Sequence, residues 1–128
     1  MNFVILVAMT MSGFLIGTQA INCYSCHDYS QGNTVEKVCQ DADIVTCHEV
    51  DDRCYAMSLT YGDSADVTDS VSRFCVDSSV EVGDANGLDC NAMELNIMPN
   101  YPEGTPFSCE EQICESDACN TLGQERFQ

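Results

Sequence analysis

Two cysteines and a histidine near the start of the chain could bind haem or a metal ion. Cys23, Cys26 and His27 match the C-x-x-C-H pattern of covalent haem attachment. Haem would use only two of the ten cysteines, and a zinc site would need a second closely spaced pair of cysteines or histidines. Cysteines that are oxidised to disulfides cannot act as thiolate ligands. We therefore expect no cofactor and no metal bound through these residues.

Two histidines, His27 and His48, are the only side chains that could serve as a base at neutral pH. Nucleophilic catalysis also needs an activated nucleophile, and no serine lies in a motif of that kind. Each histidine directly follows a cysteine. We expect both imidazoles to lie at strand edges or in exposed loops, and we do not expect an enzyme.

Carboxylates gather at several places along the chain and could bind calcium, which prefers oxygen ligands. The local groups are Asp41 with Asp43, Asp51 with Asp52, and Asp63 with Asp66 and Asp69. None of them has the spacing of an EF-hand loop. Weak binding of calcium or of a calcium mineral at many sites therefore stays open, and it would suit an acidic extracellular matrix protein.

The overall charge is strongly negative, with 21 acidic residues against four basic ones and a formal net charge of −17. A chain of this charge repels phosphate, so nucleic acid, heparin and anionic lipid are poor partners. Cationic proteins, cationic peptides and divalent metal ions are the partners that the charge favours. The alternative is that the acidity only keeps the protein soluble.

The two ends of the chain bear on its location. Residues 1–20 are mostly apolar, contain no charge and end in Thr18, Gln19 and Ala20, which predicts a cleaved signal peptide. The alternative is an N-terminal membrane anchor, for which this stretch is short. Residues 121–128 have no hydrophobic run, so we expect no membrane anchor there. We expect a secreted, extracellular protein whose ten cysteines form disulfides.

Strands must position these side chains, because alternation of apolar and polar residues dominates the pattern. Tyr55, Met57, Leu59 and Tyr61 alternate with small or polar residues, which predicts a strand with one apolar face. Its expected partner is residues 71–76, and residues 62–70 between them form a long acidic hairpin tip.

Two further loops can be drawn on either side of this hairpin. Residues 21–26 and 44–50 predict a first hairpin joined by a polar loop over residues 28–43. Cys90 and Cys109 bracket a third loop, in which Met93, Leu95 and Ile97 alternate with polar residues; residues 90–97 could also form a short helix. Spacing alone leaves the pairing of the ten cysteines open.

The first and last cysteines resemble those of a known family. Cys23-Tyr24-Ser25-Cys26 at the start and Cys114-Glu115-Ser116-Asp117-Ala118-Cys119-Asn120 at the end are similar to the two ends of three-finger domains of the lymphocyte antigen 6 and urokinase receptor type. The resemblance covers residues 21–120 and leaves residues 121–128 as a C-terminal tail. It implies a small, disulfide-rich all-β fold, the three-finger or snake-toxin-like fold, whose members bind proteins and are not enzymes.

The resemblance also implies roles for individual residues. Asn120 is expected to hydrogen-bond into the cysteine-rich palm. In the family the eighth and ninth cysteines are adjacent, whereas four residues separate Cys109 from Cys114 here, so we expect an inserted turn or bulge. The implied disulfides are Cys23 with Cys54, Cys26 with Cys39, Cys47 with Cys75, Cys90 with Cys109, and Cys114 with Cys119.

The tip of the middle finger is the expected contact surface. Asp63, Asp66 and Asp69 lie there without a lysine or arginine. We expect the protein to recognise an extracellular protein with a basic patch through these acidic loops, with association that slows steeply as salt is added.

Overall fold

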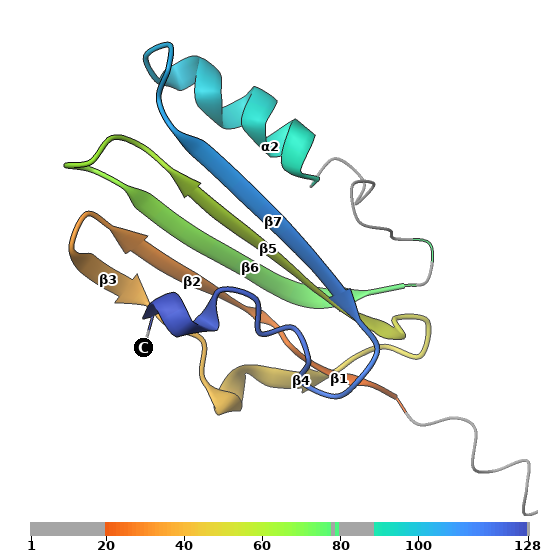
Figure 1. Cartoon of the computed structure of the whole chain (residues 1–128). Coiled ribbons are helices and arrows are strands. Elements are labelled where there is room, and N and C mark those ends of the chain that lie inside the picture. The colour runs from red at the N-terminus through yellow and green to blue at the C-terminus, as the bar shows by residue number, and fades with distance from the viewer. Residues whose placement is uncertain (1–19, 78, 80–88, 128) are drawn as a thin grey trace, which may run out of the picture.

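The computed structural model describes residues 20–77, 79 and 89–127, so the predicted signal peptide lies outside the described residues except for Ala20. The described residues form a small, disulfide-rich, mainly β fold (Figure 1). None of the helices in this part of the chain is long and apolar enough to cross a membrane. The strands are β1 (Asn22–Tyr24), β2 (Cys26–Gln31), β3 (Thr34–Lys37), β4 (Ile44–Thr46), β5 (Arg53–Tyr61), β6 (Thr68–Val76) and β7 (Phe107–Cys114). The helical segments are α2 (Cys90–Ile97) and the short 3-10 turns η2 (Asp41–Asp43), η3 (Met98–Asn100) and η4 (Gln124–Phe127).

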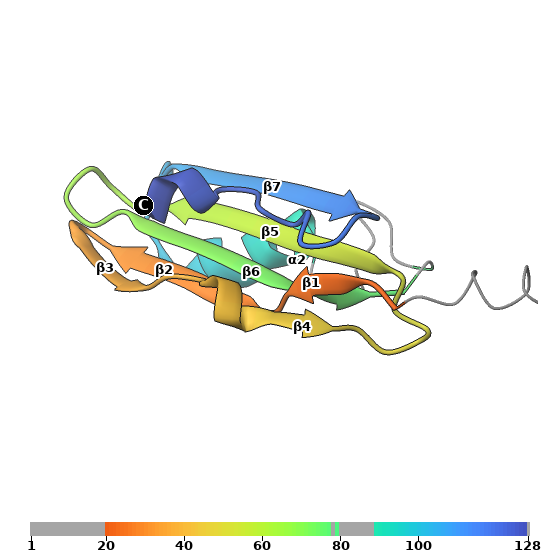
Figure 2. The ribbon, with the colours of Figure 1, turned by 90° about the horizontal axis from the view of Figure 1, so that it is seen from below.

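The strands form two antiparallel sheets. A five-stranded sheet has the order β3-β2-β6-β5-β7, and β1 pairs with β4 in a separate two-stranded sheet. The long strands β5 and β6 lie at the centre of the larger sheet, with β2 and β7 on either side (Figures 1 and 2). The remaining structure is arranged around this central hairpin.

The central hairpin confirms the strand predicted from alternation. β5 pairs with β6 from Arg53 opposite Val76 to Tyr61 opposite Thr68. The predicted tip over residues 62–70 is too long, because residues 68–70 belong to β6 and pair with both β5 and β2. The real tip is residues 62–67. Gly62 opens it with a φ of 114°, and a side chain there would collide with the backbone of Asp66.

One face of the large sheet, which we call the helix face, contains the apolar core. Tyr55, Met57 and Leu59 point to it from β5 and are buried together with Val76. α2 covers this face above β5 and β7, and its side chains Met93 and Ile97 pack against the buried cluster. Alternating side chains of a strand lie on the same face, so the predicted apolar stripe of β5 is the surface that α2 covers.

The third loop therefore begins with the helix that the sequence allowed rather than with an alternating strand. Met93 and Ile97 are four residues apart and share one side of a helix, whereas Leu95 points away and is 75% exposed. The Asp89 side chain caps the helix by accepting a hydrogen bond from the Ala92 amide at 2.7 Å. The Cys90–Cys109 disulfide fastens the start of α2 to β7.

The first hairpin is partly as predicted. β1 and β4 pair from Asn22 opposite Thr46 to Tyr24 opposite Ile44. The expected polar loop over residues 28–43 is wrong, because its first part is a second hairpin made of β2 and β3 with a turn at Gly32 and Asn33. β2 then joins the large sheet beside β6. Its inward side chains are polar, so an apolar pattern could not reveal it.

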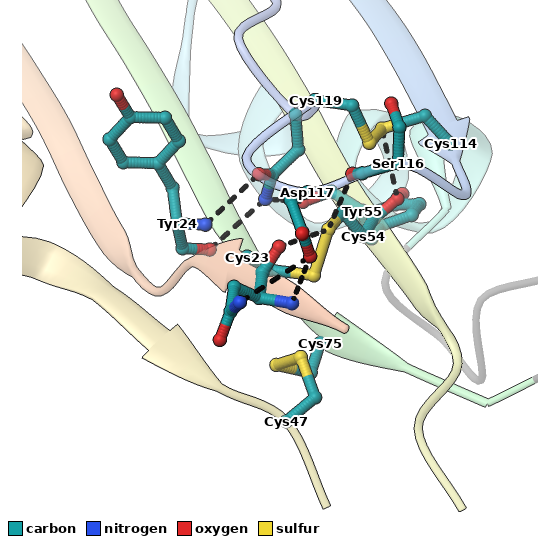
Figure 3. Close-up of a disulfide and its surroundings, with 12 residues drawn as sticks. Cys23, Tyr24, Cys47, Cys54, Tyr55, Cys75, Cys114, Ser116, Asp117 and Cys119 are labelled. Carbon is teal, nitrogen blue, oxygen red and sulfur yellow. Dashed lines mark hydrogen bonds between the residues drawn. A yellow bond between two sulfur atoms is a disulfide. The ribbon is translucent and has the colours of Figure 1, made fainter. Parts of the chain in front are cut away.

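Five disulfides link these elements, and they are the same five pairs that the family resemblance implies. Three of them gather where the strands converge, and this cluster is the palm (Figure 3). The Asn120 side chain lies in the palm and is completely buried. The bonds are Cys23–Cys54, Cys26–Cys39, Cys47–Cys75, Cys90–Cys109 and Cys114–Cys119.

The four residues between Cys109 and Cys114 do not form the expected turn or bulge. β7 stays in one register with β5, from Phe107 opposite Tyr61 to Cys114 opposite Cys54. Neighbouring residues of a strand point to opposite faces of the sheet. An insertion of four residues, an even number, does not change this relation, so Cys109 and Cys114 still point to opposite faces. Cys109 can therefore bond to α2 on the helix face while Cys114 bonds in the palm.

The residues after Asn120, which the family resemblance leaves as a tail, pack against the opposite face of the large sheet. We call this face the C-terminal face (Figure 2). The guanidinium of Arg126 binds the hydroxyls of Ser58 and Thr60 there. Phe127 is 6% exposed at the end of η4. Residues 121–127 are thus part of the folded unit, and Gln128 lies outside the described residues.

Candidate binding surface

The structure separates the three aspartates that were expected to act together. Asp63 and Asp66 lie exposed in the hairpin tip. Asp69 lies on β6, where its carboxylate accepts a hydrogen bond from the Thr60 hydroxyl at 2.6 Å and is 3.2 Å from the Arg126 guanidinium. Asp69 is therefore engaged within the fold, and two of the three carboxylates remain at the tip.

The tip itself is held in shape by its own acidic side chains. The Asp63 carboxylate accepts hydrogen bonds from the backbone amides of Ala65 and Asp66, at 3.0 and 3.1 Å. The Asp66 carboxylate accepts from the side-chain amide of Gln31 at 3.3 Å, which links the tip to the end of β2. Each carboxylate keeps acceptor capacity toward solvent, because in both residues these hydrogen bonds reach only Oδ1, one of the two carboxylate oxygens.

An apolar hollow of about 330 Å³ lies directly beside the tip. Its apolar wall comes from Tyr61, Val67, Pro106 and Phe107, which belong to the tip end of the central hairpin and to the chain at the start of β7. The Tyr101 ring lies edge-on to Tyr61 with ring centroids 5.5 Å apart. Burial raises the pKa of Tyr61, and Tyr101 raises it further, so this wall stays uncharged at neutral pH. The remaining lining residues are Thr60, Gly62, Ser64 and Ser108.

Most of the few basic groups are already paired with carboxylates inside the molecule. The Arg53 guanidinium lies 3.4 Å from Glu115, and Arg126 is paired with Asp69. Arg73 is buried in an ion pair with Asp28. With 21 acidic residues in the chain, internal pairing therefore leaves a large excess of negative charge on the surface.

The Asp28–Arg73 pair is a feature that the sequence did not reveal. Both side chains are about 1% exposed, on neighbouring strands β2 and β6. Asp28 also accepts from the Cys39 amide, and Arg73 donates to the Leu122 carbonyl at 2.9 Å. The pair thus joins two strands, the Cys26–Cys39 loop and the C-terminal segment. The two residues are distant in sequence, so no local pattern indicates their contact.

The two histidines have different surroundings. His48 is exposed in the loop after Cys47, as expected. His27 lies on β2, with Nδ1 3.0 Å from the Ser72 hydroxyl and Nε2 3.3 Å from the Ser70 hydroxyl. Burial lowers the pKa of His27, and the charge of Lys37 lowers it further. Both ring nitrogens face serines of one strand, so the contact holds β2 and β6 together and leaves no ring nitrogen for an orienting carboxylate.

The structure also shows which residues could ligate a metal ion. In the described part of the chain, three ligand atoms of His, Cys, Asp or Glu come within 4.8 Å of one another at only two places. Both places consist of cysteines that are joined in disulfides, Cys23 with Cys47 and Cys75, and Cys54 with Cys114 and Cys119. Disulfide sulfurs are not thiolate ligands, so the C-x-x-C-H cysteines cannot bind zinc or attach haem in this state.

The acidic groups named for calcium are spread over the molecule. Asp41 accepts a hydrogen bond from the Tyr24 hydroxyl at 3.0 Å, and Asp43 accepts from the Gln40 amide at 2.9 Å. Asp51 and Asp52 lie in the loop before β5. Over the described ranges, no three carboxylates share one site. Any calcium would have to be held by one or two carboxylates at a time.

The chain as a whole was compared with protein-family models, curated proteins and solved structures. It matches no family model, no curated protein and no solved structure.

Proposed function

We propose that this protein is a secreted, non-enzymatic binding module of the three-finger type, similar to lymphocyte antigen 6 and urokinase receptor domains. It recognises an extracellular protein with a basic patch through its acidic loops. The observation that carries the proposal is the tip at residues 62–67, where Asp63 and Asp66 are exposed beside an apolar hollow. A small apolar surface ringed by charge is a common composition of protein interfaces.

The disulfide framework supports the module and its location. Three disulfides form the palm from which the loops extend, and two more brace the first and third loops, so the tips are presented on a rigid base. Disulfides of this number form in an oxidising compartment, which agrees with a signal peptide at residues 1–20. We place the protein outside the cell.

The surface charge supports the choice of partner. Three of the four basic side chains are paired internally. Few cations of the protein therefore remain to compete with a basic partner for the other carboxylates. Opposite charge speeds the encounter and salt screens it over a distance of about 10 Å at 0.1 M ionic strength. Association is therefore expected to be fast at low salt and slow at high salt.

A selection from a random peptide library displayed on phage tests the proposal. The disulfide-bonded protein is immobilised, and binding is carried out at about 0.02 M and about 0.3 M salt. We expect the peptides enriched at low salt to be rich in lysine and arginine. The double variant Asp63→Asn, Asp66→Asn is expected to bind the selected peptides about fivefold or more weakly. Asparagine keeps the carbonyl oxygen that caps the tip, so the fold is retained.

The matched control removes the same charge elsewhere. Asp51→Asn, Asp52→Asn alters the loop before β5, at the opposite end of that strand from the tip. This control is expected to change peptide affinity less than about twofold. Selection of peptides without basic residues would contradict the proposal, and so would an equal loss of affinity in the two double variants.

A further inference from the structure

The apolar hollow beside the tip lies next to a second hollow on the C-terminal face. The second hollow has a volume of about 230 Å³ and is lined by polar residues of β5, β7 and the C-terminal segment. Thr60 and Ser108 line both hollows, and they lie opposite each other in the register of β5 and β7. The two hollows are therefore neighbours, and we call them together the groove, with an apolar end and a polar end. The residues that line the polar end are Ser58, Thr60, Ser108, Glu110, Gly123, Glu125 and Arg126.

The chain's own C-terminal segment shows which chemical group this face of the sheet accepts. The guanidinium of Arg126 donates hydrogen bonds to the hydroxyls of Ser58 and Thr60 and pairs with Asp69. These groups come from β5 and β6, and the C-terminal segment lies along them (Figure 2). The hydroxyl and carboxylate oxygens of the sheet are thus already arranged to accept a planar cation.

Two carboxylates at the polar end remain available to a second cation. Glu110 on β7 and Glu125 on η4 are both exposed and line the hollow. Neither carboxylate has an ion-pair partner among the described residues. Arg126 lines the same hollow, but Asp69 balances its charge. The polar end of the groove therefore carries net negative charge next to an apolar wall.

We propose that this groove is a docking site for a partner segment that presents an apolar side chain next to a lysine or arginine. The apolar side chain fills the hollow between Val67 and Phe107, and the basic group lies beside Glu110 and Glu125. This proposal rests on the proposed function and names the part of the partner that is recognised. It adds an apolar anchor to the charge attraction, and such buried anchors supply most of the affinity in protein interfaces.

Small aromatic probes of similar size and different charge test the groove directly. Benzamidine, benzyl alcohol and benzoate are titrated separately into the isotope-labelled, disulfide-bonded protein, and amide shifts are followed by NMR. We expect saturable shifts at Gly62, Val67, Ser108 and Gly123, with benzamidine binding about fivefold more tightly than benzyl alcohol and benzoate more weakly than either. Saturable shifts confined to another part of the molecule would overturn the proposal, as would equal binding of benzoate and benzamidine.

Paired variants assign the effect to the groove. Glu110→Gln is expected to weaken benzamidine about threefold and to leave benzyl alcohol unchanged, whereas Val67→Ser is expected to weaken both probes. Glu103→Gln is the control, because it removes the same charge from an exposed position of the third loop outside the groove. An equal effect of Glu103→Gln and Glu110→Gln would overturn the groove proposal.

The outcome is separable from that of the proposed function. If the selected basic peptides depend on Asp63 and Asp66 but no probe binds the groove, the acidic tip acts alone and only the groove proposal fails. If benzamidine binds the groove but the selection yields no basic peptides, the proposed function fails. If the groove is used, the selected peptides are expected to carry an apolar residue directly beside a basic one, and Val67→Ser is expected to weaken them.

Discussion

The side chain of Asn120 hydrogen-bonds both backbone groups of Tyr24, accepting from its amide at 3.1 Å and donating to its carbonyl at 3.0 Å. The same amide nitrogen also donates to the Tyr55 carbonyl at 3.0 Å. One side chain thus acts like a short piece of β-strand between β1 and β5. It holds the end of the chain against the palm, where Figure 3 shows the disulfides packed together.

Replacing Asn120 by alanine is expected to destabilise the protein by about 3 kcal/mol or more, because three buried backbone groups lose a partner at about 1–3 kcal/mol each. Urea unfolding of the disulfide-bonded protein measures the change. Asn91→Ala, on the exposed side of α2, serves as control and is expected to change stability by less than about 0.5 kcal/mol. A loss below about 1 kcal/mol for Asn120→Ala would show that these bonds are easily replaced by water.

The Asp28–Arg73 pair is expected to show strong coupling in a double-mutant cycle. Arg73→Met leaves a buried carboxylate, and Asp28→Asn leaves a buried guanidinium, so each single change is expected to cost about 3–5 kcal/mol. The double variant is expected to cost less than the sum by about 1–3 kcal/mol, because neither charge is then left alone. Free energies of unfolding for the four proteins give the coupling directly. If the two single changes in the free energy of unfolding add up to that of the double variant, the two charges are not coupled.

The C-terminal segment gives a test of the domain boundary. Phe127 is buried at the end of η4, so Phe127→Ala is expected to cost about 3 kcal/mol of stability. Glu125→Ala in the same segment is the control and is expected to change stability by less than about 0.5 kcal/mol, since this side chain is exposed. If residues 121–128 were a tail outside the domain, the two variants would be equally stable in thermal or urea unfolding.

The stability of the protein is expected to depend on pH through His27. Burial and the charges of Lys37 and Arg73 lower the pKa of His27 in the folded state below its usual value of 6.5. The charge of Asp28 raises this pKa but only partly opposes them. Between the folded pKa and 6.5 the unfolded chain binds more protons, so stability rises with pH in that window and falls on acidification. Urea unfolding at about pH 5 and about pH 7.5 measures this, with His27→Gln as comparison.

The expected result is a difference between the two proteins that grows with pH. The parent protein gains stability over His27→Gln as the pH rises. The comparison between variants is needed because acid also reduces the repulsion among 21 carboxylates. An advantage of the parent protein that is larger at acidic pH would contradict the assignment.

Calcium titration separates the binding module from the matrix-protein alternative. The described carboxylates do not gather in threes, so we expect no saturable heat when calcium reaches about 1 mM in isothermal titration. We likewise expect no adsorption to calcium carbonate or calcium phosphate beyond that of another protein of similar charge. Saturable calcium binding or strong adsorption would favour the alternative function.

The sequence predicts the central part of the fold well because its signals are local. The alternation of Tyr55, Met57, Leu59 and Tyr61 marks β5, since one face of that strand is covered by α2. β2 and β3 escape detection for the opposite reason. The buried side chains of β2 include Asp28, whose partner Arg73 is far away in the sequence, and all of β3 is exposed.

The candidate site is only partly visible in the sequence for the same physical reason. Asp63 and Asp66 are at the tip because residues 62–67 form a turn, which glycine and aspartate indicate. Asp69 differs because it belongs to β6, which pairs with both β5 and β2, and because its carboxylate pairs with Arg126 from a distant part of the chain. The groove is missed altogether, since its walls come from β5, β7 and the C-terminal segment.

The position of Cys119 and Asn120 near the end of the chain has a consequence for biosynthesis. A chain that is made from its N-terminus cannot complete the palm until these residues have been synthesised. Before then Cys114 has no disulfide partner, and the backbone of Tyr24 and Tyr55 lacks the side-chain amide of Asn120 to which it hydrogen-bonds. The part of the disulfide-bonded region that is translated last therefore acts as a checkpoint. A chain cut short before Cys119 would keep an unpaired thiol at Cys114, which distinguishes an unfinished molecule from a finished one in an oxidising compartment.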